Sequence, residues 1–141
     1  MTVTFCGHRN ISQAESQRLT SLLYTELEKL IKDGADTFLL GGYGDFDLLC
    51  AQTVKRLKEK YPDIISTLVI PYIDRDYNKD LYDDSEYPPL EKVPKKFAIL
   101  KRNEYMVQKS DVVITYVVFS WGGAYETLQY AKRKKKFIVN L

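Results

Sequence analysis

The sequence is poor in the residues that build disulfide frameworks and metal sites. It contains two cysteines, Cys6 and Cys50, and one histidine, His8. Two distant cysteines do not form the framework of a small secreted domain, and with one histidine they do not supply the ligand spacing of a zinc site. We therefore expect no metal, no cofactor and a reducing, cytoplasmic location.

Long apolar runs are also missing. The amino terminus, MTVTFCGHRN, has no basic start followed by an apolar stretch, and no segment approaches the ~18 apolar residues that span a bilayer. These absences predict a soluble protein that is neither exported nor bound to a membrane.

Three common catalytic motifs are absent. The first predicted strand ends in Gly7-His8-Arg9-Asn10 instead of G-x-G-x-x-G, and Gly42-Tyr43-Gly44 follows the second strand and continues to Asp47. An NAD-dependent oxidoreductase is therefore disfavoured. The chain also lacks a Gly-Lys-Ser/Thr phosphate loop and a Gly-x-Ser-x-Gly elbow, which argues against a Walker-type ATPase and a serine hydrolase.

The charge is nearly balanced. Lys and Arg number 21 against 19 Asp and Glu, which gives a net charge of +2. The basic run Lys132–Lys136 closes the last predicted helix, where cations offset the helix dipole. We therefore expect nucleic acid to be an unlikely partner.

Strand-like and helical patterns alternate along the 141 residues. Ser12 and Glu15 form a capping-box signature, Gly34 stands where a left-handed helix cap belongs, and Pro62 ends the second helical pattern. The predicted strands are 1–6, 37–40, 64–70, 111–117 and 137–141, and the helices begin near Ser12, after Gly44, near Lys95 and at Ala124.

This alternation predicts an α/β fold. We expect one domain over residues 1–141, a Rossmann-like three-layer sandwich with a mostly parallel five-stranded sheet in the order 3-2-1-4-5. The connection from Pro71 to about Pro94 includes a tyrosine-rich segment, 72–87, and is longer than the ~12 to 15 residues usual for a structureless loop. It is interpreted as a lid or a dimer arm.

The predicted site lies at the carboxyl ends of the strands, where open parallel sheets bind ligands. Three loops that leave strands there open helices, whose amino termini attract anions. We expect a phosphate at Gly122-Gly123 with help from Arg9, and sugar hydroxyls near Asp45 or Asp47. The full set of predicted ligand-binding residues is Gly7, His8, Arg9, Gly41, Gly42, Gly44, Asp45, Asp47, Arg102, Asn103, Ser120, Trp121, Gly122, Gly123 and Thr127.

Several of these residues also allow a purely structural interpretation. Asp45 is a natural helix cap, and glycines turn tightly without any ligand. His8 is as well suited to a structural role as to proton transfer. Arg102 and Asn103 could lie on a solvated helix face, and Trp121 could stack on a base or anchor an interface.

Together the motifs resemble a known superfamily. Thr4-Phe5-Cys6-Gly7-His8-Arg9, Leu40-Gly41-Gly42-Tyr43-Gly44-Asp45-Phe46-Asp47, Arg102-Asn103, Ser110-Asp111 and Ser120-Trp121-Gly122-Gly123-Ala124 are similar to short stand-alone bacterial proteins of the SLOG superfamily. The superfamily includes the lonely-guy phosphoribohydrolases, the DNA-processing protein DprA and nucleotide sensors. The resemblance covers nearly the whole chain and implies a Rossmannoid fold, a nucleotide-like ligand and a dimer.

The resemblance does not extend to catalysis. Lonely-guy enzymes have a Pro-Gly-Gly-x-Gly-Thr-x-x-Glu turn, whereas this chain has Trp121-Gly122-Gly123-Ala124-Tyr125-Glu126-Thr127. If hydrolysis occurs, a carboxylate must stabilise oxocarbenium charge and activate water, and Glu126 and Asp47 are the candidate catalytic residues.

Three hypotheses follow. The first is a sensor or sequestering module that binds a nucleotide-derived small molecule. The second is a hydrolase of an N-glycosidic bond in a nucleotide. The third is a protein-interaction module that uses the tyrosine-rich segment.

Overall fold

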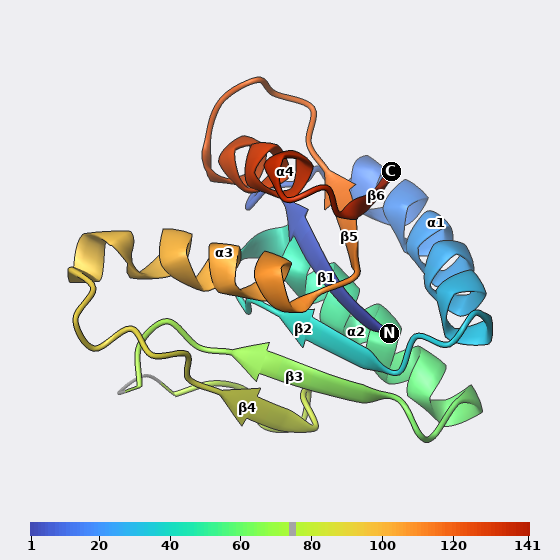
Figure 1. The fold of residues 1–141 in the computed structure, drawn as a ribbon. Coiled ribbons are helices and arrows are strands. Elements are labelled where there is room, and N and C mark those ends of the chain that lie inside the picture. The colour runs from blue at the N-terminus through green and yellow to red at the C-terminus, as the bar shows by residue number, and fades with distance from the viewer. Residues whose placement is uncertain (74–75) are drawn as a thin grey trace.

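The computed structural model describes residues 1–73 and 76–141. The positions 74–75 of the predicted lid or dimer arm lie outside the described residues. Within the described ranges strands and helices alternate, and a parallel sheet lies between two pairs of helices (Figure 1). The predicted Rossmann-like α/β fold is confirmed.

Six strands of the described chain form the sheet, all paired in parallel, in the order β4-β3-β2-β1-β5-β6. The first strand, β1, is central and pairs with β2 and β5. The five expected strands take the predicted order, and one further strand joins at the edge. The bounds are β1 (Thr2–Gly7), β2 (Thr37–Leu40), β3 (Ile65–Val69), β4 (Asp84–Glu86), β5 (Val112–Tyr116) and β6 (Phe137–Asn140).

The strand β4 is the one that sequence analysis missed. Asp84–Glu86 consists of three polar residues and has no apolar alternation to reveal it. Its pairing with β3 is supported by the preceding Asp83, whose carboxylate accepts the Ser66 N–H at 2.9 Å and lies 2.7 Å from Lys58 Nζ. Tertiary anchoring, and not local propensity, makes this segment a strand.

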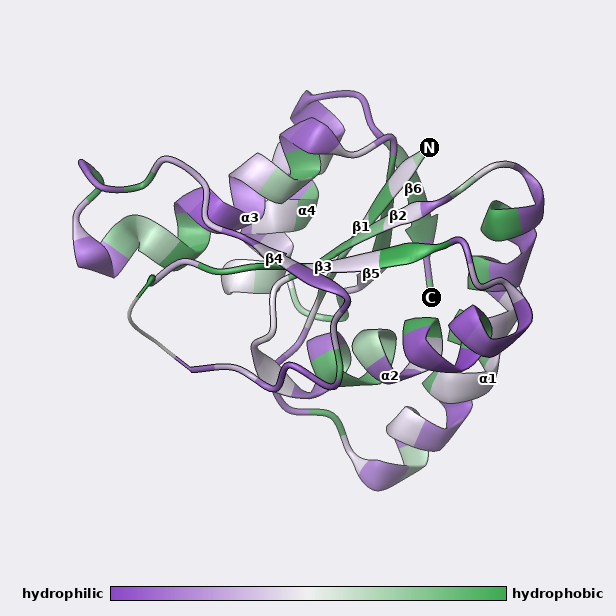
Figure 2. Cartoon of the chain, turned by 90° about the horizontal axis from the view of Figure 1, so that it is seen from below, coloured by the Kyte–Doolittle hydropathy of each residue, from purple (hydrophilic) through white to green (hydrophobic). Residues whose placement is uncertain are grey.

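Helices cover both faces of the sheet (Figure 2). Helices α1 (Gln13–Lys32) and α2 (Gly44–Lys60) pack on one face, and α3 (Ala98–Lys109) and α4 (Gly123–Arg133) pack on the other, with a short 3-10 turn, η1 (Lys95–Phe97), before α3. The larger hydrophobic core lies under α1 and α2, and its fully buried members include Val3, Leu19, Leu23, Leu27, Phe38, Leu40, Phe46 and Leu57. No helix of the described ranges is long and apolar enough to cross a membrane.

The predicted helix boundaries have the expected local causes. The Ser12 hydroxyl accepts the Glu15 N–H at 3.2 Å and caps α1, while Gly34 follows the helix with φ of 111°. The carboxylate of Glu15, however, reaches Tyr116 and Arg18. The capping-box sequence therefore supplies one cap and one tertiary contact.

Candidate ligand-binding site

A cavity of about 310 Å³ lies where β1, β2 and β5 end. The parallel order brings the loops that follow these strands to one edge of the sheet, as the sequence predicted. Ten of the predicted ligand-binding residues line it: Gly7, His8, Arg9, Asp47, Arg102, Asn103, Trp121, Gly122, Gly123 and Thr127. Gly41, Gly42, Gly44, Asp45 and Ser120 do not line this cavity, and neither does Glu126.

The backbone at the start of α4 is open to the cavity. Gly122 has φ of 95° and precedes the helix without a side-chain cap, so no side chain of the described residues accepts the first N–H groups of α4. A Cβ atom built on Gly122 or Gly123 would meet no atom of residues 1–73 and 76–141 within 4 Å. This helix end therefore offers unpaired donors and its positive dipole to a ligand.

The other loop glycines are in close contact with protein atoms. A Cβ on Gly7 would lie 2.3 Å from the Phe46 ring, and one on Gly44 would lie 2.7 Å from the Arg9 backbone. Gly44 also has φ of 86°, a conformation that side chains rarely adopt. These two glycines are required by packing, whereas Gly122 and Gly123 have no such requirement within the described residues.

The glycines of the β2–α2 loop are likewise in close contact with protein atoms. A Cβ on Gly41 would lie 2.9 Å from the Asp47 carboxylate, and one on Gly42 would lie 2.7 Å from Leu68. Asp45 accepts the Ile11 N–H at 2.9 Å and so ties the two loops together. The role of Asp45 is thus structural, but the prediction that it caps its own helix is wrong, because the N-cap of α2 is Tyr43 and no side chain caps it among the described residues.

Arg102 is a buried structural cation. Its guanidinium donates to the carbonyl oxygens of Gly41 and, at 2.9 Å, Val69, and its Nε donates to Asn103. Arg102 thus fixes the ends of β2 and β3 from α3. Desolvation lowers the pKa of its guanidinium, although the nearby Asp47 carboxylate opposes this shift.

Arg9 is exposed and lines the cavity. Its guanidinium carbon lies 5.9 Å from the ring centroid of Tyr43, and the guanidinium carbon of Arg102 lies 5.5 Å from the same ring. No ion pair among the described residues involves Arg9. Its charge is therefore positioned for an anion in the cavity.

Asp47 is the one predicted catalytic carboxylate that faces the cavity. Desolvation raises its pKa to about 6, and the Arg102 charge and the hydrogen bond that its Oδ2 accepts from the Tyr43 N–H, at 3.2 Å, limit that rise. Such a carboxylate holds a proton in mildly acidic solution. Glu126 is exposed and lies outside the cavity lining.

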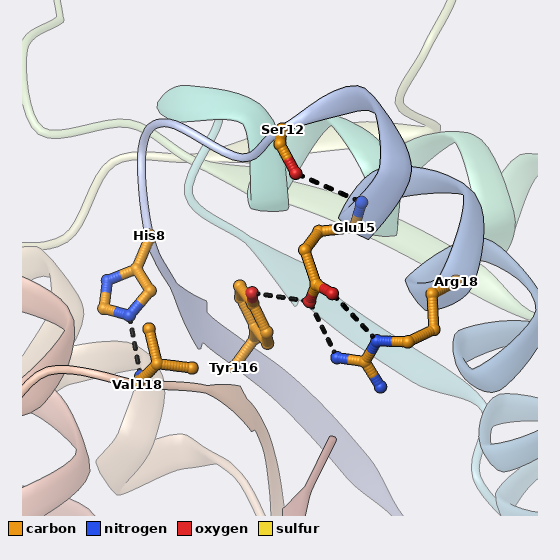
Figure 3. A network of polar contacts seen from close by, with 6 residues as sticks. All are labelled: His8, Ser12, Glu15, Arg18, Tyr116 and Val118. Atoms are coloured by element: carbon orange, nitrogen blue, oxygen red, sulfur yellow. Dashed lines mark hydrogen bonds and ion pairs between the residues drawn. The ribbon is translucent and has the colours of Figure 1, made fainter.

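His8 has a structural contact that fixes the β5–α4 loop. Its Nε2 accepts the Val118 N–H at 2.8 Å, so the ring is neutral with its proton on Nδ1 (Figure 3). Desolvation lowers the pKa of His8, which favours this neutral form. The ring also lies 5.0 Å from that of Phe119, which stacks on Trp121 at 5.2 Å.

Beside His8, a second polar network joins α1 to β5 (Figure 3). The Tyr116 hydroxyl donates to the Glu15 carboxylate at 2.8 Å, and Arg18 donates to the same carboxylate at 2.9 Å. Both bonds lower the pKa of Glu15, and the bond from Arg18 has the larger effect. The Tyr116 ring also meets the ring of His8 edge to face, with 5.6 Å between the centroids, so the network contacts a residue of the cavity lining.

Sequence analysis did not single out Tyr43, Phe119 or Asn10, which also line the cavity. Phe119 directly precedes the predicted Ser120-Trp121-Gly122-Gly123 turn, so its place beside Trp121 could have been noticed. Tyr43 lies within the predicted Gly41–Gly44 loop, so its place at the cavity could also have been noticed, but its contacts with Arg9 and Arg102 from distant segments could not. Thr127 donates to the Gly123 carbonyl at 2.9 Å and so steadies the first turn of α4.

Solved structures of low sequence identity share this fold. DprA from Helicobacter pylori, described in terms of its single-stranded DNA binding, is 21% identical with a TM-score of 0.68, and 99% of this chain aligns with 64% of DprA. DprA from Streptococcus pneumoniae is 18% identical with a TM-score of 0.73. The alignment includes 99% of this chain and 49% of that protein. TM1055 is 15% identical with a TM-score of 0.65, over 97% of this chain and 71% of TM1055. This chain thus spans less than two thirds of either DprA protein.

The expectation that nucleic acid is an unlikely partner is wrong. It relied on a balanced net charge, yet a structurally similar protein binds single-stranded DNA. Single strands are held by stacking on aromatic rings and by a local positive groove, and neither is visible in a whole-chain charge count.

Among curated proteins, none matches the sequence significantly. The family model named YpsA, described as the YspA SLOG family, matches residues 6–136 and so includes every loop of the cavity. The resemblance proposed from the loop motifs is thereby confirmed, and the chain belongs to this SLOG family.

Proposed function

We propose that this protein binds a nucleotide, with the phosphate at the amino terminus of α4 and the base against Phe119 and Trp121. The observation that carries the proposal is the open backbone of Gly122 and Gly123, beside which a Cβ would meet no atom within 4 Å. This space lies in a cavity of about 310 Å³, near the lower end of the roughly 300–1,000 Å³ typical of ligand pockets.

The phosphate half of the proposal depends on complementary charge. The uncapped N–H groups of α4 and the exposed guanidinium of Arg9 line the same cavity. Backbone donors at a helix start and a guanidinium are both good phosphate ligands. Asp47 opposes an anion when it is ionised, and its raised pKa weakens that opposition below about pH 6.

The base half depends on two exposed aromatic rings. Trp121 is 68% exposed and Phe119 is 50% exposed, and both line the cavity. Rings left in water at the rim of a cavity gain contact area when a planar base stacks on them. The His8 bond to Val118 holds this pair in place before a ligand arrives.

The same chemistry would recognise a free nucleotide or a nucleotide within single-stranded DNA. Both present a phosphate and a base with a face free to stack. The DNA binding of the structurally similar DprA makes the second source a necessary arm of the test.

Fluorescence of Trp121, the sole tryptophan, provides the test. The protein is titrated with AMP and with a 5′-phosphorylated decathymidylate, in the wild type and in the variant Arg9→Gln. The matched control is Arg56→Gln, because Arg56 also lies over a tyrosine ring, at 5.0 Å from Tyr24, but outside the cavity. We expect Arg9→Gln to weaken binding about tenfold or more and Arg56→Gln to leave it unchanged.

The two ligands separate the two sources. Quenching by AMP alone indicates a free nucleotide, and quenching by the oligonucleotide alone indicates a strand. Absence of quenching by both, with no binding by calorimetry, contradicts the proposal. Release of adenine from AMP would add hydrolysis, for which Asp47 is the better placed candidate because Glu126 does not line the cavity. Dimer formation stays a prediction, which sedimentation of the same samples checks.

A further inference from the structure

A second cavity, of about 400 Å³, adjoins the first at the carboxyl ends of β2 and β3. Tyr43 lines both cavities and, among the described residues, is the one common to their linings. Besides Leu48 and Leu68, the lining of the second cavity includes described residues of the tyrosine-rich segment, namely Tyr72, Asp76, Tyr77, Asn78, Leu81 and Tyr82. The proposed nucleotide site therefore continues across Tyr43 into a space that one nucleotide would not fill.

The walls of the second cavity suit a planar base. Leu48 and Leu68 supply apolar surface, and Tyr77 and Tyr82 supply aromatic rings. The amide oxygen of Asn78 in the lining accepts the Asp80 N–H at 3.0 Å, and its NH₂ group can donate to the polar edge of a base. A few polar groups among apolar and aromatic walls are the usual composition of a small-molecule pocket.

This part of the chain is held by specific contacts. The Tyr77 hydroxyl donates to Ser85 Oγ at 2.9 Å, which ties the wall to β4. The pairing of β4 with β3 fixes the position of the segment relative to the sheet. A Cβ on Gly42 would lie 2.7 Å from Leu68, so the opposite wall is closely packed as well.

Two guanidinium groups lie where the two cavities meet, together with the Asp47 carboxylate, which accepts the Tyr43 N–H at 3.2 Å. The ring of Tyr43 has the guanidinium carbons of Arg9 and Arg102 at 5.9 and 5.5 Å from its centroid. A phosphate group that joins two nucleosides would lie near this boundary, with one nucleoside on each side.

We propose that the ligand contains two nucleosides joined through phosphate, the first in the α4 cavity and the second in the tyrosine-lined cavity. This inference rests on the proposed nucleotide binding and assigns the second cavity to the second base. It also gives the tyrosine-rich segment a role in ligand binding.

The test compares three probes by calorimetry: AMP, adenosine 3′,5′-bisphosphate and the dinucleotide pApA. The bisphosphate carries the additional phosphate without a second nucleoside. The difference between its affinity and that of pApA therefore measures what the second cavity contributes to binding. We expect pApA to bind at least about tenfold more tightly than the bisphosphate. Once its first nucleoside is bound, the second nucleoside enters the second cavity in an intramolecular step.

Two variants test whether the higher affinity for pApA comes from the second cavity. Leu48 is 47% exposed on α2 and lines only the second cavity, so Leu48→Glu should fold and should abolish the advantage of pApA while leaving AMP affinity unchanged. Leu22→Glu is the control, since Leu22 is 37% exposed on α1 outside both cavities.

The outcomes separate the two proposals. Equal affinity for pApA and the bisphosphate, or an advantage that survives Leu48→Glu, overturns the second-nucleoside assignment, while AMP binding that depends on Arg9 leaves the proposed function standing. If none of the three probes binds, both proposals fail.

Discussion

At the scale of the residue, the glycines of this site divide into two kinds. Gly7, Gly41, Gly42 and Gly44 leave room for protein atoms, because a Cβ on any of them would lie within 2.9 Å of a neighbour. Gly123 faces open space and has no positive φ. A residue that is small without a packing reason is a candidate for ligand approach.

This distinction predicts the behaviour of Gly123→Ala. The new methyl group meets no protein atom, and alanine favours the helix, so the free energy of unfolding should stay equal or rise by up to ~1 kcal/mol. Nucleotide affinity should fall about tenfold or more, because the methyl group occupies the approach to the backbone. Thermal melts and calorimetry check both halves. Loss of stability without loss of affinity would reverse the interpretation.

Asp47 predicts an unusual dependence of stability on pH. Its pKa is about 6 in the folded protein against an ordinary value of 3.8, so the folded state binds more protons between these values. Its contribution to stability is therefore complete below pH 4 and is lost as the pH rises to about 6. The residue as a whole is half-buried at the cavity, although its carboxyl is desolvated, so we expect a loss of about 2 kcal/mol.

Asp47→Asn should remove this loss. Denaturation curves from pH 4 to pH 7 should show wild type losing stability relative to the variant as the pH rises, since the asparagine amide does not titrate. The amide oxygen can still accept the Tyr43 N–H. A constant difference between the two proteins across the range would show that the Asp47 pKa is not raised.

At the scale of the element, the β5–α4 loop depends on His8. The neutral imidazole accepts the Val118 N–H and contacts Phe119. His8→Phe keeps a ring and removes the acceptor. The exposed amide can then bond to water, so stability should fall by less than ~1 kcal/mol, while nucleotide affinity should fall several-fold as the loop loosens.

Hydrogen exchange of the Val118 amide measures this effect directly. Exchange should be faster in His8→Phe and, in wild type after correction for intrinsic rates, faster at a pH low enough to protonate His8. Protonation converts Nε2 from an acceptor to a donor, and the lowered pKa places this change below the ordinary value of 6.5. Tyr116→Phe is the control, because it removes a hydroxyl bond to Glu15 and leaves the His8 acceptor. Unchanged exchange in His8→Phe would contradict the role.

Elements with a strong local signal were predictable. Leu19, Leu23 and Leu27 recur at helical spacing and are buried together, and Ser12 caps α1 as its sequence indicates. The strand β4 was not predictable, because Asp84–Glu86 is polar and its pairing depends on Asp83, Ser66 and Lys58.

At the scale of the whole molecule, strand order brings the predicted loops together. Parallel strands with β1 at the centre place the ends of β1, β2 and β5 at one edge, so the convergence of Arg9 with Gly122-Gly123 could be predicted. The side-chain partners could not. The burial of Arg102 against the carbonyls of Gly41 and Val69 depends on three distant segments, and a local pattern does not encode it.

The central claim is that a phosphate binds the backbone that opens α4. Titration of ¹⁵N-labelled protein with AMP, followed by NMR, tests it most directly. We predict the largest shift changes at the amides of Gly122, Gly123 and Ala124 and at the Trp121 indole N–H. Changes confined to the basic run Lys132–Lys136, or no changes at millimolar AMP, would contradict the account.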